Sequence, residues 1–78
     1  MGKTKMKLRI SNNIHILRAE EKITQEQLAN AIEVTRATIN AIEKEHYNPS
    51  LELAFRVARF FKKDVTEVFK VEGSYEKN

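Results

Sequence analysis

Two short amphipathic segments joined by a tight hinge stand out in this sequence, over residues 24–43. Thr24 and Gln27 have the spacing of a capping box, which predicts that a helix begins directly after the first of them. Thr35 repeats the capping signal, so a second helix is expected after a hinge at residues 32–34. The pattern predicts two helices that meet at a tight turn, with the outer face of the second offered to a partner. The residues expected to face a common core are Leu28, Ile32, Ile39 and Ile42.

The size and composition of the chain exclude several classes of protein. With 78 residues and one marginal core, a single small domain that gains stability by forming a dimer is expected. The absence of cysteine excludes a disulfide scaffold, zinc ribbons and thiol catalysis. No apolar stretch approaches the roughly 20 residues that a membrane helix needs. We therefore expect a soluble, cytoplasmic protein that does not enter a membrane.

The net charge of +3 is distributed unevenly. Residues 1–18 carry basic side chains and no acidic ones, whereas residues 19–45 carry six acidic side chains against three basic ones. A simple basic patch therefore does not argue for nucleic-acid binding in the hinge region, and that function has to be argued from geometry. No pair of nucleophile and base, no cluster of metal ligands and no glycine-rich phosphate loop is evident, so we expect no catalytic site, metal, cofactor or small-molecule ligand.

Two period-two patterns bracket the helical part of the chain. Residues 6–10 and 69–73 alternate apolar and charged side chains, which predicts strands that pair as an antiparallel ribbon joining the termini. Between them we expect a helix ending near Glu21, the hinged pair, a fourth helix capped by Ser50 and a short fifth helix beginning with an Asp64 capping box. The expected organisation is a mobile tail (1–5), one domain (6–74) containing a helix-turn-helix (25–44), and a second tail (75–78).

The order of these motifs resembles that of the Cro/C1-type helix-turn-helix proteins, also called the XRE family of transcriptional regulators. The resemblance covers residues 12–69 and implies an all-α, five-helix, lambda-repressor-like DNA-binding domain. With a ribbon at its termini, the chain most resembles small dimeric repressors of this family. The motifs that carry the resemblance are Leu17-Arg18, Thr24-Gln25-Glu26-Gln27-Leu28-Ala29, Val34-Thr35-Arg36, Thr38-Ile39, Ile42-Glu43, Tyr47-Asn48-Pro49-Ser50 and Leu53-Ala54.

The resemblance also implies roles for individual residues. Arg18 and Glu43 match a structural ion pair, which would hold the first helix against the second helix of the helix-turn-helix. Arg36 and Asn40 would bind guanine and adenine, each with about 1–3 kcal/mol of discrimination. The residues expected to contact base edges are Thr35, Arg36, Ala37, Asn40 and Ala41. Those expected to contact the DNA backbone are Gln25, Lys44, Tyr47 and Asn48.

Four residues stand where the family often has glycine, at positions that commonly need a positive φ. A non-glycine residue there costs on the order of 1 kcal/mol if the backbone is unchanged, so slightly remodelled turns are a second possibility. The four are Lys22, Glu33, Glu45 and Lys62.

Each of these residues also has a simpler interpretation. Arg36 and the basic residues near the N-terminus can be plain solvated side chains, and His15 and His46 are best explained as surface residues. Large apolar side chains near the C-terminal end are too numerous for the surface of a small monomer, although core packing explains any single one. The candidates for a dimer interface are Phe60, Phe61, Val65 and Phe69.

The sequence thus predicts a homodimeric repressor that binds a pseudo-palindromic operator in double-stranded DNA through the major groove. The alternative is a protein-interaction role, such as an antitoxin or an adaptor that uses the same helical surface. The acidic hinge region is compatible with that alternative. An enzyme is the least supported class.

Overall fold

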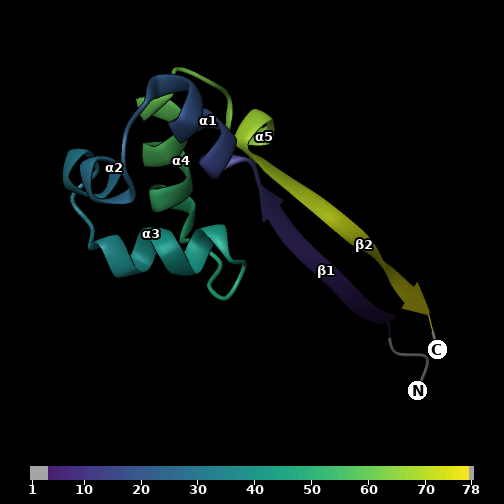
Figure 1. Cartoon of the computed structure of the whole chain (residues 1–78). Helices are drawn as coiled ribbons and strands as arrows, with labels where there is room; N and C mark the ends of the chain where they lie inside the picture. The colour runs from purple at the N-terminus through teal and green to yellow at the C-terminus, as the bar shows by residue number, and fades with distance from the viewer. Residues whose placement is uncertain (1–3, 78) are drawn as a thin grey trace.

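The structure, a computed structural model, describes the backbone of residues 4–77 and the side chains of residues 8–73. Within this range a bundle of five short helices carries a two-stranded ribbon that projects away from it (Figure 1). The elements are β1 (Thr4–Asn12), α1 (Ile14–Glu21), α2 (Gln25–Ala31), α3 (Arg36–Glu43), α4 (Leu51–Phe60), α5 (Val65–Val68) and β2 (Phe69–Lys77).

The helices begin where the capping residues of the sequence predict. In α2 the Thr24 hydroxyl accepts from the Gln27 amide at 3.0 Å, and the Gln27 side chain accepts from the Thr24 amide at 2.8 Å. The Ser50 hydroxyl accepts from the Leu53 amide at 3.1 Å at the start of α4. Because these bonds satisfy amides that have no partner within the helix, they define the first residue of each helix.

Four helices end in the same way. At the end of α1, the amide of Lys22 donates to the carbonyl of Ala19 and the amide of Ile23 donates to that of Arg18, the paired bonds of a Schellman motif. The same pairing ends α2, α3 and α4. Each motif needs one residue with a positive φ, and the residues there are Lys22 (57°), Glu33 (64°), Glu45 (62°) and Lys62 (58°). The left-handed turns are therefore kept without glycine, and they are not remodelled.

The core lies between the helices and is wholly apolar among the described residues. The four core residues expected from the hinged pair are all buried. Ala29 is 1% exposed, and its small side chain lies in α2 where the helix packs against the core. Helix α4 contributes four buried residues, Leu53, Ala54, Val57 and Ala58.

The ribbon makes the expected all-α class inexact. β1 and β2 pair antiparallel in continuous register from Thr4↔Lys77 to Asn12↔Phe69, so the ribbon is longer than the predicted 6–10 and 69–73. The pattern ends early in the sequence because polar residues and Gly73 interrupt the alternation, whereas backbone pairing continues through them. Of the two expected tails, residues 4–5 and 75–77 lie in the strands, and residues 1–3 and 78 lie outside the described range.

Side chains anchor the base of the ribbon to the helices. The Asn12 amide nitrogen donates to the carbonyl of Ile42 at 2.9 Å, which ties the end of β1 to α3. The Arg9 guanidinium contacts Glu72 at 2.6 Å across the ribbon and Glu45 at 2.9 Å beyond α3. The ribbon base is thereby held close to the helix whose outer face is of interest below. Its far end extends into solvent, and the molecule measures 49 × 21 × 19 Å.

Candidate nucleic-acid interface

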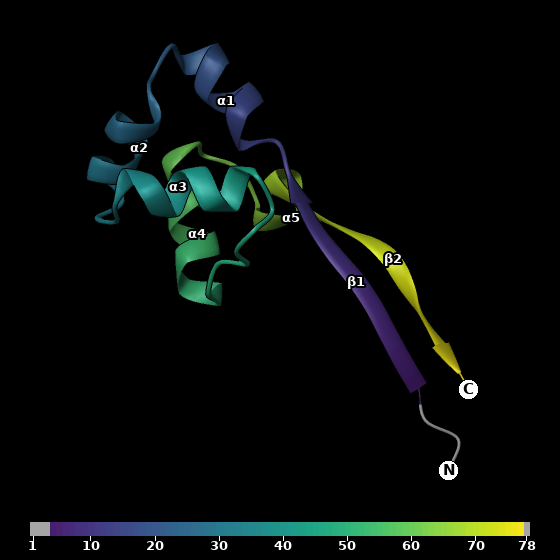
Figure 2. The same cartoon turned by 60° about the horizontal axis from the view of Figure 1, so that its bottom comes forward.

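Helices α2 and α3 form one side of the bundle, away from the free end of the ribbon (Figure 2). Thr35 caps α3 through its hydroxyl, which accepts from the amide of Thr38 at 3.2 Å. Ile39 and Ile42 turn into the core, and the opposite face of α3 is left to solvent. Thr35, Arg36 and Ala37 are exposed, and Asn40 and Ala41 are partly exposed. The five residues expected to contact bases therefore share one accessible helix face.

A network of side chains holds this face in place from behind. The Arg18 guanidinium donates to both carboxylate oxygens of Glu43, at 2.6 and 3.1 Å, and to the carbonyl of Ile23 at 3.1 Å. The Gln25 amide nitrogen lies 3.2 Å from Glu43 Oε1 and 3.3 Å from Asn40 Oδ1, and donates to them. Helices α1, α2 and α3 are thus linked through one carboxylate. The network positions Asn40 before any partner arrives.

The ion pair at the centre of this network is well shielded from water. The Arg18 and Glu43 side chains are 18% and 9% exposed. The hydrogen bond to Glu43 raises the pKa of the Arg18 guanidinium above its ordinary value, against a smaller opposing effect of burial. A raised pKa of a basic group stabilises the fold at every pH below the ordinary value and is lost only in strong alkali. The pair is therefore intact throughout the range in which proteins are studied.

Arg36 lies at the first position of α3 and reaches the mouth of a shallow hollow. The hollow is also lined by Arg18, Gln25 and Glu26. No ion pair involves Arg36 among the side chains of residues 8–73. A free guanidinium beside two helix N-termini is available to an anionic or electronegative partner.

The residues expected near the DNA backbone lie around this face. Gln25 begins α2 and is partly buried by its bonds to α3. Lys44 ends α3 and is exposed, and Tyr47 (47% exposed) and Asn48 lie in the loop that follows. The four surround the exposed face of α3 at its two ends. Elsewhere, His15 and His46 are exposed, as expected.

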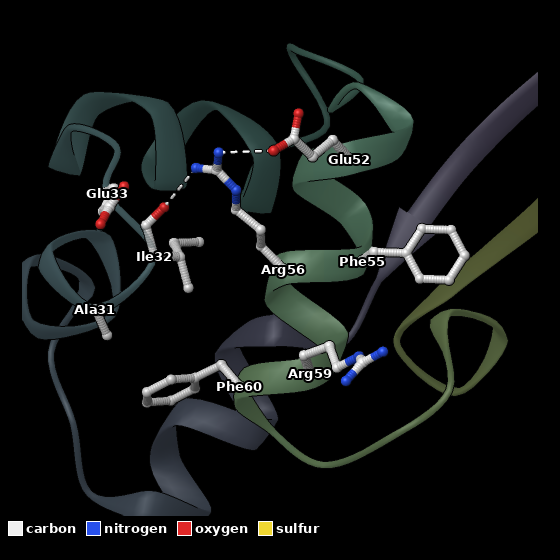
Figure 3. Close-up of a pocket in the computed structure, with 8 residues that line it drawn as sticks. All are labelled: Ala31, Ile32, Glu33, Glu52, Phe55, Arg56, Arg59 and Phe60. Atoms are coloured by element: carbon white, nitrogen blue, oxygen red, sulfur yellow. Dashed lines mark hydrogen bonds and ion pairs between the residues drawn. The ribbon is translucent and has the colours of Figure 1, made fainter.

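One positioning residue was missed in the sequence. Arg56 of α4 donates to the carbonyl of Ile32 at 3.0 Å and to Glu52 at 2.8 Å (Figure 3). The first bond holds the turn between α2 and α3 against α4. An arginine four residues after a glutamate signals an i,i+4 pair, but nothing local indicates its bond to a carbonyl 24 residues away.

The expected dimer-interface residues are divided by the structure. Phe61 and Phe69 are buried in the core at 8% exposure each, and Val65 is partly buried against it. Phe60 is 38% exposed and meets Phe61 edge to face at 5.0 Å. The single chain therefore leaves Phe60 as the accessible member of the set. Other exposed apolar residues, not singled out for an interface in the sequence, are Leu8, Leu51, Phe55 and Val71.

Other kinds of site find no support among the described residues. No group of three or more histidine, cysteine or acidic side chains there is placed to hold a metal ion. No helix in the described part of the chain is long and apolar enough to cross a membrane.

Comparison with known proteins agrees with the geometry. A family model described as helix-turn-helix matches residues 14–68. An uncharacterised HTH-type transcriptional regulator of Methanocaldococcus jannaschii is 45% identical over 60 residues, which cover 77% of this chain and 91% of that protein. A similarly named regulator of Bacillus subtilis is 40% identical over 63 residues, covering 81% and 96%. A crystal structure from Bacteroides fragilis has a TM-score of 0.70 at 24% identity, covers 78% and 98% of the two chains, and shares the fold.

Proposed function

Because this chain belongs to the Cro/C1-type helix-turn-helix family of transcriptional regulators, the XRE family, we propose that it is a homodimeric repressor of a specific operator. The observation that carries the proposal is the exposed face of α3, which the Arg18–Glu43–Gln25 network holds rigidly. An α-helix fits the major groove of B-DNA, where each base pair presents a distinct pattern of donors and acceptors. The relatives are named as transcriptional regulators, and we propose no catalytic activity.

Three residues of α3 read the bases in this proposal. The Arg36 guanidinium donates two hydrogen bonds to O6 and N7 of a guanine, and the Ala37 methyl contacts a thymine methyl. Asn40 pairs with an adenine. Gln25 donates to Asn40 Oδ1, which leaves the Asn40 amide hydrogens and the second lone pair of Oδ1 for the base. Thr35 and Ala41 contact bases at the two ends of the same face.

The surrounding residues set the position of the helix on DNA. Lys44, Tyr47 and Asn48 contact phosphates beyond the end of α3, and Gln25 adds a phosphate contact near its start. Such contacts fix orientation without reading sequence. In a dimer, two copies of α3 enter successive major grooves about 34 Å apart, so the operator is a pseudo-palindrome.

Repression follows from occupancy of a promoter. A dimer bound over the promoter blocks polymerase, and the chain's own operon is a natural target. The proposal includes a single domain over residues 6–74 and a cytoplasmic location, where the DNA of a prokaryotic cell lies. Regulation then comes from dimer stability, concentration or a partner protein.

Selection from a random duplex library tests the proposal and identifies the operator in the same experiment. We expect enrichment of a two-fold symmetric sequence. Fluorescence anisotropy with that duplex and a scrambled one should show a preference for the former and a steep loss of affinity with salt, because phosphate contacts release counterions. Failure to enrich any sequence would contradict the proposal, and a complex with a protein whose affinity barely changes with salt would favour an antitoxin or adaptor.

A further inference from the structure

An uncovered apolar surface lies where the ribbon meets α4 and α5. Val71 of β2 is 63% exposed and Leu51 of α4 is 73% exposed, and both line one groove. Leu8, two residues further along β1, is 46% exposed. We call this the ribbon-base surface, and its members are Leu8, Ile10, Leu51, Val65 and Val71.

The alternation of the strands creates this surface. In the antiparallel register Ile10 lies opposite Val71 on one face, and Arg9 lies opposite Glu72 on the other. The charged face is already satisfied within the chain, because Arg9 contacts both Glu72 and Glu45. The apolar face is covered by α4 and α5 only near its base, where Ile10 packs against the core.

Gly73 leaves the outer part of the apolar face open. It lies opposite Leu8, has a φ of 96° and offers no side chain to cover its neighbour. Beyond it the backbone register pairs Met6 with Tyr75, still without a third strand or a helix alongside (Figures 1 and 2). A two-stranded ribbon is at best marginally stable in water unless its apolar face packs against something. The ribbon therefore needs a cover that the described part of the chain does not supply.

We propose that a second copy of this chain covers the ribbon-base surface, so that the ribbon is a dimerisation element. This inference rests on the proposed homodimer and deepens it. A two-fold interface brings a surface against itself, which is favourable for an apolar surface and unfavourable for one with charges of a single sign. Among the described residues that line the groove, only Lys70 is charged, and it is exposed at the edge of the strand.

The position of this surface suits a DNA-binding dimer. Asn48 and Pro49, from the loop after α3, line the same groove. A copy seated there brings the two loops towards each other and leaves the two α3 helices on either side of the axis. A stable pair buries about 800 Å² on each partner, which is roughly one seventh of the 5744 Å² of accessible surface here. The contact therefore needs only this end of the molecule.

Sedimentation of the full chain without DNA tests the inference. Leu51→Glu and Val71→Lys place charges on the surface through two different elements. Both residues are exposed in the single chain, and a glutamate in the first turn of α4 is favourable to that helix. Ile16→Lys is the matched control, because Ile16 is 49% exposed on α1. We expect a wild-type dimer, at least about a tenfold rise in the dimer Kd for the first two variants, and no change for the control.

Three results would overturn the inference. They are a wild-type monomer at every concentration, dimerisation of Leu51→Glu and Val71→Lys as tight as wild type, or an equal loss in the Ile16 control. Circular dichroism establishes that each variant is folded. The readout contains no DNA, so a dimer that selects no operator would contradict the proposed function and leave the interface standing, whereas a monomer that selects one would do the reverse.

Discussion

The α3 face and the ribbon-base surface differ in how much of their shape the single chain provides. Behind α3, one carboxylate receives hydrogen bonds from α1 and α2, and every helix from α1 to α4 ends in a satisfied Schellman motif. The ribbon has two strands, one satisfied charged face and one apolar face that the chain covers only at its base. Recognition is thus built within a protomer, while the ribbon is completed between protomers. Variants should separate the two.

The largest effect is expected where the α3 face is anchored. Glu43→Ala removes the only carboxylate that the described structure gives to Arg18 and leaves a shielded guanidinium unpaired. We expect a loss of about 2–3 kcal/mol of unfolding free energy, slightly below the range for fully buried pairs, and thermal denaturation measures it. The exposed Arg9–Glu72 pair provides the comparison, and Glu72→Ala should cost at most about 1 kcal/mol. An unchanged melting temperature for Glu43→Ala would remove the argument for a braced helix.

Arg36→Ala should act on DNA and leave the fold alone. The side chain is exposed and forms no ion pair with residues 8–73, so the melting temperature should not change. Preference for the selected operator over a scrambled duplex should fall by about 1–3 kcal/mol, since a bidentate contact is lost. Arg59→Ala is the control, because Arg59 is an exposed arginine of α4 on a different surface. Equal losses from both variants would indicate general charge attraction in place of base reading.

Much of the fold follows from local signals in the sequence. Thr24 with Gln27, Thr35 and Ser50 are caps whose partners lie three residues away, so the starts of α2, α3 and α4 could be predicted. The positive φ at Lys22, a lysine, could be expected only from the family resemblance. Local patterns identify such elements because the interactions that form them are themselves local.

Contacts between distant elements were less accessible. The bond from Arg56 to Ile32 depends on how α4 crosses the α2–α3 turn, which no pattern within α4 specifies. Phe60 and Phe61 are adjacent, so both could be suggested for an interface, and only the packing of α4 decides that Phe61 is buried. The proposed roles in DNA binding still depend on the resemblance and on the experiments above.

Arg56→Ala tests whether α4 supports the recognition turn. The guanidinium bond to the Ile32 carbonyl is part-buried, and its loss should cost about 1 kcal/mol of stability. Affinity for the operator should fall by a similar factor if the turn loosens. Glu52→Ala is the control, because it removes the exposed partner of Arg56 and keeps the bond to Ile32. A larger effect from Glu52→Ala than from Arg56→Ala would contradict a supporting role for that bond.

The smallest expected effect is a gain in stability at the end of α4. Lys62 has a φ of 58°, which strains a residue with a side chain but not glycine. Lys62→Gly should raise the unfolding free energy by about 0.5–1 kcal/mol, offset in part by the greater freedom of glycine in the unfolded chain. Because this turn lies inside one protomer, the gain should persist at every protein concentration, whereas the loss from Val71→Lys should fade as dilution separates the wild-type dimer. A Lys62→Gly gain confined to high concentration would mean that the helical domain also depends on pairing, and the contrast between the two regions would fail.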